Sequence, residues 1–359
     1  MDSQLLQNIS YYANYLWTFL EPIILLIAPR KILSSYMLHK DFKPKNITKV
    51  SIPVELKQKY SSVDLNAFGH GRIREVVKDF VDVMEREFPK EALANFYNNI
   101  NEAKIKRNAG VMLIESSGVY LCKKNKINVS AISSLYHELF HLASSSYDPE
   151  AKLARAGFSQ VYHTLTSPFE GVNMGIGLNE GYTELLTQRY FDGKCKPNKY
   201  YRFEVNVASN VEKIVGEEEM KKLYLKSDLR GLIENLKQYA SEEEVMQFVN
   251  SVDLVSRHST DIFLFRNSKM KASITNVYTF LMKAYLTKLK RQLEEGAITI
   301  NEFVDQATEY IKALKTKVKF FGHTYNYMTV ESLLDVTKEI VKIQEEYPKN
   351  IATSGIYKK

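Results

Sequence analysis

His137-Glu138-Leu139-Phe140-His141 fits the pattern H-E-x-x-H, and this stretch decides how the rest of the chain is interpreted. Residues four apart on an α-helix share one face, so His137 and His141 can present two imidazoles to one metal ion. Glu138 lies one position along, beside such a metal and not on it, where a base for an attacking water belongs. Because histidine is rare, chance produces this pattern well under once in a chain of this length.

The residues around this motif predict an α-helix. Apolar residues recur at three- and four-residue steps over residues 130–143 and would form a stripe that faces the core. Ser130 or Ser133 can serve as the N-cap, and Pro149 cannot continue the helix. The alternative interpretation is two half-buried histidines that are satisfied by hydrogen bonds alone.

A third ligand has to come from another segment, because a catalytic zinc ion typically has three protein ligands and one open position. Residues 177–190 predict a second helix, with Asn179 as its N-cap and Gly193 beyond its C-terminal end. Glu180 lies in the predicted first turn, and Glu184 follows four residues later on the same face. A helix with His-x-x-x-His and a helix with Glu-x-x-x-Glu could then meet around one metal ion.

This pairing resembles the gluzincin class of zinc metallopeptidases, which share the thermolysin-type active site. The resemblance implies that His137, His141 and Glu180 bind one Zn²⁺ per chain. It implies that Glu138 is the general base. It also implies that Glu184 orients a zinc-bound imidazole by fixing its tautomer and ring angle.

The resemblance covers about residues 110 to 192 and departs from thermolysin in its spacing. The segment between His141 and Glu180 is longer and is similar to that of the anthrax lethal factor group and the Pro-Pro endopeptidases. No Gly-x-Met-Glu-Asn segment of the zinc aminopeptidase kind precedes the motif. Glu180 could instead be an ordinary carboxylate near a helix N-terminus, in which case Glu170 is the rival ligand.

The fold class that we expect is α+β and predominantly α-helical, with a zincin-like catalytic core. Residues 110–122 predict two short strands joined by a turn, and residues 156–166 predict a further strand or hairpin arm. These strands would form a small mixed or antiparallel sheet. The first hairpin either binds an extended substrate by strand addition or is an ordinary part of the core.

The rest of the chain predicts helices with core-facing stripes. Ser241 with Glu244 and Thr299 with Glu302 are candidate capping boxes at the start of two of them. We expect three parts: an N-terminal apolar or peripheral segment over residues 1–50, the zincin-like catalytic core over 51–200, and a helical C-terminal subdomain over 201–359.

The oxyanion of a peptidase reaction needs a hydrogen-bond donor, and the resemblance implies a tyrosine or histidine on a later helix. The sequence does not rank the candidates, which are Tyr182, His258, Tyr278, His323 and Tyr325. His163 is expected to be a surface or hydrogen-bonded residue.

Composition limits the partners and the compartment. The chain has 49 basic and 42 acidic residues, a net charge of +7, and the two signs are mixed along it. No basic block interleaved with aromatic residues predicts a nucleic-acid groove. Cys122 and Cys195 provide no disulfide framework and suit a reducing compartment, so we expect a cytoplasmic protein.

Residues 16–28 are apolar but are interrupted by Glu21 and Pro22. The uninterrupted part, residues 23–28, is too short to span ~30 Å of hydrocarbon. Soluble packing or a peripheral helix is therefore expected, and membrane association through residues 16–28 is the alternative.

The activity that these observations predict is zinc-dependent hydrolysis of a peptide or protein substrate. One alternative is a zinc-binding pseudo-peptidase that acts as a binding or regulatory module. Another is a helical interaction protein in which the motif is accidental.

Overall fold

Helices make up most of the fold, and each follows an apolar stripe in the sequence. The computed structural model describes residues 50–53, 56–107, 118–162, 173–195, 197–198, 201–258, 268–314, 318–320, 323–325 and 337–346. Its main helices are α2 (Arg72–Glu87), α3 (Ala94–Asn101), α4 (Leu135–Ala143), α5 (Ile176–Tyr190), α6 (Arg202–Val215), α7 (Glu217–Leu225), α8 (Leu229–Leu236), α9 (Glu242–His258), α11 (Ser268–Glu294) and α12 (Ile300–Leu314). Residues 337–346 form a further helix.

The strands are short and lie in three small sheets. The first has the order β1-β3-β2, the second the order β4-β5-β6-β7, and the third is the pair β8-β9. Their bounds are β1 (Lys104–Arg107), β2 (Gly118–Leu121), β3 (Lys126–Val129), β4 (Ser145–Asp148), β5 (Leu153–Ala156), β6 (Ser159–Tyr162), β7 (Asn173–Met174), β8 (Val318–Phe320) and β9 (His323–Tyr325). β1 runs parallel to β3, and the other pairings are antiparallel. The prediction of a mostly helical α+β fold with a small mixed sheet is confirmed.

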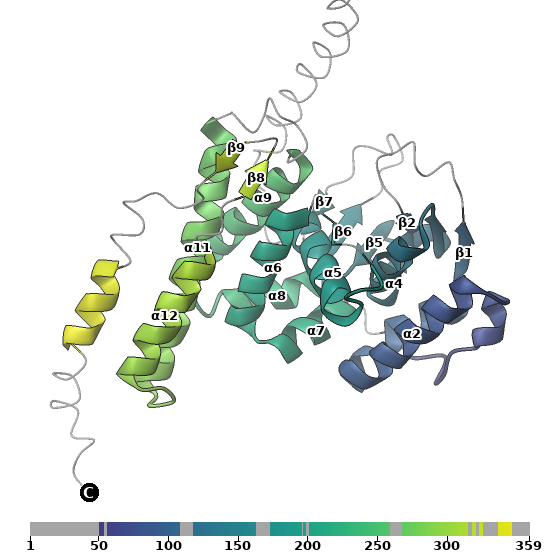
Figure 1. Ribbon diagram of the computed structural model, residues 1–359, viewed down its shortest axis with the longest axis horizontal. Coiled ribbons are helices and arrows are strands. Elements are labelled where there is room, and N and C mark those ends of the chain that lie inside the picture. The colour runs from purple at the N-terminus through teal and green to yellow at the C-terminus, as the bar shows by residue number, and fades with distance from the viewer. Residues whose placement is uncertain are drawn as a thin grey trace, which may run out of the picture.

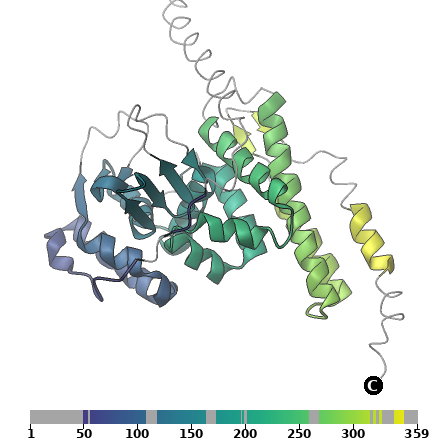
Figure 2. The same cartoon turned by 180° about the vertical axis from the view of Figure 1, so that it is seen from behind.

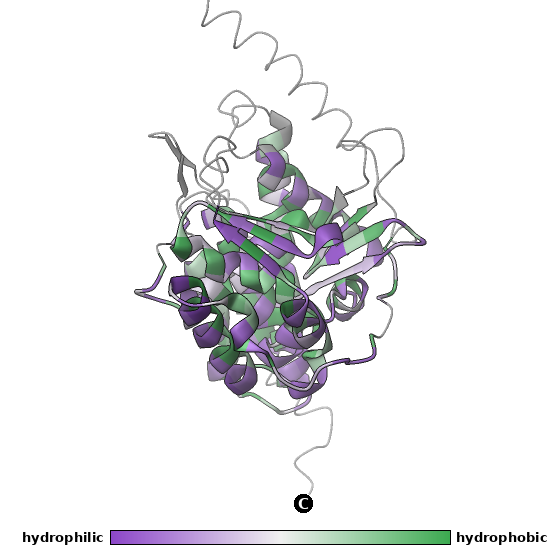
Figure 3. Ribbon diagram, turned by 90° about the vertical axis from the view of Figure 1, so that its right-hand side faces the viewer, coloured by the Kyte–Doolittle hydropathy of each residue, from purple (hydrophilic) through white to green (hydrophobic). Residues whose placement is uncertain are grey.

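The strands β1 to β7 lie on one side of the molecule, and the longest helices lie on the other together with β8 and β9 (Figure 1). Figure 1 shows β1, β2 and α2 at one end, α11 and α12 at the opposite end, and α4, α5 and α6 between them. The view from behind in Figure 2 shows the same order. One buried apolar cluster extends from Val50 to Ile340 and holds these parts together. Figure 3 shows hydrophilic and hydrophobic residues side by side along many of the helices, as expected for helices that cover a core.

Two helix starts match the capping boxes that the sequence predicts. The Ser241 amide donates to Glu244 Oε2 at 3.0 Å, and the Glu244 amide donates to Ser241 Oγ at 3.3 Å. Thr299 and Glu302 exchange the same two hydrogen bonds at 2.7 and 3.3 Å. These contacts are local in sequence, which is why the pattern alone reveals them.

The predicted starts of the two motif helices are wrong. Neither Ser130 nor Ser133 is the N-cap of α4, because residues 132–134 form a 3-10 turn and the helix starts at Leu135. α5 starts at Ile176, so Asn179 lies inside it. The cap comes from another helix, since the buried Asp253 carboxylate of α9 accepts the amides of Gly175 and Gly177 at 2.7 and 3.1 Å.

The strand predictions are right in kind and shifted in place. Of the hairpin predicted over residues 110–122, residues 110–117 lie outside the described residues, and β2 pairs with β3, a strand that the sequence did not predict. The arm predicted over residues 156–166 corresponds to the β5–β6 hairpin, which begins earlier. β2 lies against α4, so the first sheet flanks the helix that carries the histidines.

Several predictions fall on residues outside the described ranges, namely the N-terminal segment 1–49, His163 and Glu170. The side chains of His258, His323 and Tyr325 are not described either. Within the described ranges, no helix has both the length and the apolar character that crossing a membrane requires.

Candidate metal centre

α4 and α5 bring three metal-ligand side chains together. His137 Nε2 lies 3.1 Å from His141 Nε2 and 3.3 Å from Glu180 Oε2. His141 Nε2 lies 3.5 Å from the same oxygen of Glu180. Two ligands therefore come from α4, and the third comes from a helix that follows a long spacer, in the arrangement that the sequence predicts.

These separations fit a metal ion. Two ligand atoms on a tetrahedral zinc, each about 2.0–2.1 Å from the ion, lie about 3.3 Å apart. The three observed separations, 3.1, 3.3 and 3.5 Å, bracket that value. Two imidazoles and one carboxylate also form a ligand set typical of catalytic zinc. The cluster can hold a metal ion, and its geometry does not distinguish zinc from other divalent metals of the first transition series.

Glu184 lies where it can orient His137. Its Oε2 is 3.1 Å from His137 Nδ1, and its Oε1 accepts the Gln188 side-chain amide at 2.8 Å and the Asn198 backbone amide at 2.7 Å. Burial raises the pKa of Glu184, but these hydrogen bonds outweigh burial and lower it below the usual range. The carboxylate is thus ionised and accepts the Nδ1 proton of His137, which leaves Nε2 as the ligand atom.

Glu138 is buried beside the cluster and is not one of its ligands. A Cβ at Gly118 of β2 would lie only 2.7 Å from Glu138 Oε1, so a larger residue at this position would displace the carboxylate. The backbone of Tyr120 also hydrogen-bonds to it. Burial raises the pKa of Glu138, partly offset by His137 and His141. A carboxyl with a raised pKa next to a metal is suited to accept and return a proton.

The charges of the ligand groups balance one another. Burial by itself lowers the pKa of His137, but the contacts with Glu180 and Glu184 raise it to about 10. Burial raises the pKa of Glu180, and the two imidazoles lower it well below its usual range. Glu180 is therefore held as a carboxylate that faces positive charge, which a metal cation can supply in place of a proton.

Tyr201 is a further residue of the site, and no pattern in the sequence predicts it. Its ring, at the residue preceding α6, stacks on His137 with centroids 5.6 Å apart and planes at 11°. The Glu180 charge, then burial, raises the pKa of Tyr201, and its hydroxyl hydrogen-bonds to Glu180. No spacing rule connects Tyr201 to either motif, because it lies outside both motif helices and comes near them only in the folded protein.

Two of the expected oxyanion donors are core residues. Tyr182 is fully buried between Phe158 and Tyr224, and Tyr278 is fully buried and donates to Asn206 Oδ1 at 3.0 Å. Tyr201 therefore lies beside His137 and Glu180, where we expected Tyr182 or Tyr278 as an oxyanion donor.

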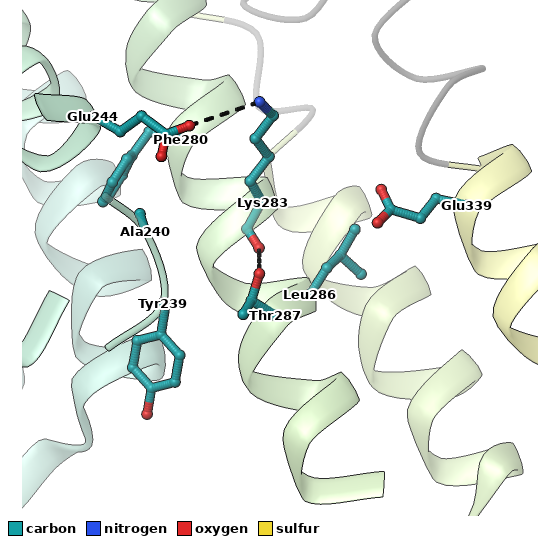
Figure 4. Close-up of a pocket in the computed structure, with 8 residues that line it drawn as sticks. All are labelled: Tyr239, Ala240, Glu244, Phe280, Lys283, Leu286, Thr287 and Glu339. Carbon is teal, nitrogen blue, oxygen red and sulfur yellow. Dashed lines mark hydrogen bonds and ion pairs between the residues drawn. The ribbon is translucent and has the colours of Figure 1, made fainter. Parts of the chain in front are cut away.

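A cavity of about 290 Å³ lies elsewhere, between α11, the start of α9 and the helix over residues 337–346 (Figure 4). Lys283 reaches across it towards Glu244 at 3.9 Å, and Glu339 borders it from the other side. None of its lining residues belongs to the metal cluster.

Comparisons with protein-family models, with curated proteins and with solved structures find no match to this chain.

Proposed function

We propose that this chain is a zinc-dependent peptidase. The observation that supports this proposal best is the convergence of His137, His141 and Glu180 on one point, with Glu138 buried beside them. A bound zinc ion would activate a water molecule and polarise the scissile carbonyl as a Lewis acid. The residues of the chain perform the other parts of the reaction.

Glu138 is the proton carrier in this proposal. It takes a proton from the water whose oxygen bonds to the scissile carbonyl carbon. When the carbon–nitrogen bond breaks, Glu138 delivers that proton to the leaving nitrogen, which departs as an amine. Its burial against Gly118 and its raised pKa suit both transfers.

Tyr201 is the proposed donor to the oxyanion. Its hydroxyl lies at the ligand cluster, and the stacking of its ring on His137 restricts where that hydroxyl can point. A fixed donor aimed at developing negative charge stabilises the transition state more than the ground state.

The alternative is a pseudo-peptidase that binds zinc and a peptide without cleaving it. The presence of Glu138 beside the ligands favours the enzyme, because a binding module has no use for a base at that position. The expected substrate in either case is a peptide or protein.

The decisive experiment compares wild type and Glu138→Gln on a peptide library, with zinc content measured for both. We expect Glu138→Gln to retain zinc and to lose about 100- to 10,000-fold in cleavage rate, since the amide cannot accept the proton. Glu150→Gln, on an exposed turn, is the control and should cleave normally. Equal cleavage by Glu138→Gln would refute the mechanism, and zinc binding without any cleavage by wild type would favour the pseudo-peptidase.

A further inference from the structure

Three buried hydroxyl groups form a chain that leads away from His141. Thr183 Oγ1 lies 3.5 Å from His141 Nδ1 and 2.6 Å from Tyr224 Oη. Tyr224 in turn hydrogen-bonds to the Ser144 side chain, and Ser144 Oγ donates to the Phe140 carbonyl at 2.8 Å. All three hydroxyl-bearing side chains have no exposed surface. The chain starts at a ligand imidazole and ends on the backbone of the helix that carries it.

The Phe140 carbonyl is the last acceptor, and it determines which group donates in every hydrogen bond of the chain. A backbone carbonyl only accepts hydrogen bonds, and each hydroxyl has a single proton to donate. Ser144 uses its proton on the carbonyl, so Tyr224 must donate to Ser144 and Thr183 must donate to Tyr224. Thr183 then has only lone pairs to offer His141. The 3.5 Å contact between Thr183 and His141 is therefore favourable only when the proton of the neutral imidazole is on Nδ1.

Asn179 supports the same tautomer. Its side-chain nitrogen lies 3.3 Å from His141 Nδ1, while its oxygen is buried without a hydrogen-bond partner. The orphaned oxygen indicates that the amide is better turned over, so that this oxygen faces His141 Nδ1. Its oxygen then also accepts the Nδ1 proton of His141.

We propose that Thr183 and Tyr224 are positioning residues that hold the proton of His141 on Nδ1 and so direct the Nε2 lone pair to the metal. Glu184 performs this task for His137 with a carboxylate, and the hydroxyl chain performs it for His141 without a charge. The proposal rests on the metal site of the proposed function, and it does not require that the protein cleaves peptides.

The surroundings of Tyr224 hold the chain in place. Its ring packs at 67° against Phe158 and at 67° against Tyr182, with centroids 5.5 and 5.2 Å apart. A Cβ at Gly157 would lie 2.2 Å from that ring, and Gly157 has a positive φ of 52° that favours glycine. Tyr224 belongs to α7, so a helix beyond the two motifs contributes to the environment of a ligand.

Zinc affinity, measured by competition with a chromophoric chelator, tests Thr183. We expect Thr183→Val to bind Zn²⁺ about 10- to 100-fold more weakly, the loss typical of an outer hydrogen-bond partner of a metal ligand. Thr183→Ser, which retains the hydroxyl, should restore most of the affinity. Thr187→Val is the matched control, because this buried threonine one turn later donates only to the Thr183 carbonyl in the contacts described. Unchanged affinity in Thr183→Val, or no restoration by serine, would overturn the proposal.

Nitrogen-15 NMR of the metal-free protein tests the tautomer itself and needs neither zinc nor activity. At a pH where the ring of His141 is neutral, two-bond correlations should show the proton on Nδ1 in wild type. In Tyr224→Phe, Thr183 loses its acceptor and can point its own proton at Nδ1, so the Nε2-protonated form should appear. Tyr278→Phe, which removes another buried hydroxyl, should leave the spectrum of His141 unchanged. A wild-type ring protonated on Nε2 would refute the proposal, whereas a wild type that binds zinc and cleaves nothing would refute only the peptidase.

Discussion

Two helix pairs in this molecule bury contact faces of opposite chemistry. α4 and α5 bury His141, Thr183 and Glu184 at their contact. α9 and α11 bury valine, leucine and phenylalanine side chains, with Phe248 stacked on Phe280 at 4.3 Å between ring centroids. Both contact faces are largely buried, so their compositions reflect different demands.

The difference shows which buried groups are present for stability. Buried apolar surface stabilises the fold directly, at roughly 25 cal/mol per Å². Buried polar groups cost free energy unless they are paired, and replacing them by apolar residues is often neutral or stabilising. The α4–α5 contact thus keeps a polar interior that folding does not require. The proposed metal site and its supporting hydrogen bonds would account for that interior.

The largest expected effect is the loss of metal from Glu180→Ala. Removal of a ligand should weaken zinc binding by at least about 1,000-fold, more than the 10- to 100-fold that the loss of an outer partner costs. The melting temperature without metal should also fall, because Glu180 pairs with the buried His137 and His141 and its removal leaves their positive charge uncompensated. Isothermal titration and thermal melts measure the two quantities.

Glu219→Ala, at a half-exposed position on α7, is the control for Glu180→Ala and should bind zinc as wild type does. If Glu180→Ala also retains full affinity, Glu170 becomes the candidate third ligand.

A loss of stability without a loss of zinc affinity is expected from Leu281→Ala in α11. Leu281 is fully buried, and truncation of such a leucine costs about 2–5 kcal/mol of unfolding free energy. Denaturant titration should show this loss, while the zinc affinity of the folded protein remains that of wild type. Val341→Ala, whose side chain is 45% exposed, should have little effect on stability. A large change in zinc affinity in Leu281→Ala would show that the two helix pairs are not independent.

A smaller effect is expected from Tyr201→Phe. Loss of one oxyanion donor costs about 100-fold in kcat, at the low end of the range for such groups. KM should be close to that of wild type, because the ring that stacks on His137 is retained, and kcat is compared at saturating zinc because the lost hydroxyl also hydrogen-bonds to Glu180. Steady-state kinetics on a cleaved library peptide measures the effect. A wild-type kcat would assign the oxyanion contact to another group.

The parts of the site that sequence predicted are those governed by helical spacing. His137 and His141 share a face because they are four residues apart, and so do Glu180 and Glu184. The capping box of Ser241 is predictable for the same reason, since all of its hydrogen bonds lie within one turn. Local rules need no knowledge of the fold.

The parts that sequence missed depend on contacts between distant segments. The N-cap of α5 was wrongly assigned to Asn179 because the actual acceptor, Asp253, lies on α9. Tyr201, just before α6, stacks on His137, and Tyr224 of α7 hydrogen-bonds to Thr183, at positions that no periodicity marks. β3 was missed because it is a short strand of four residues.

The sequence by itself determined the ligand types, their pairing within each helix and a mostly helical fold, because rotation per residue and side-chain chemistry are properties of the local chain. The tertiary structure alone decided that the two pairs converge within about 3.5 Å, that Tyr201 joins them, and that a chain of hydroxyl groups supports His141. Those features arise where helices pack together, and the geometry of packing depends on every residue of the core at once.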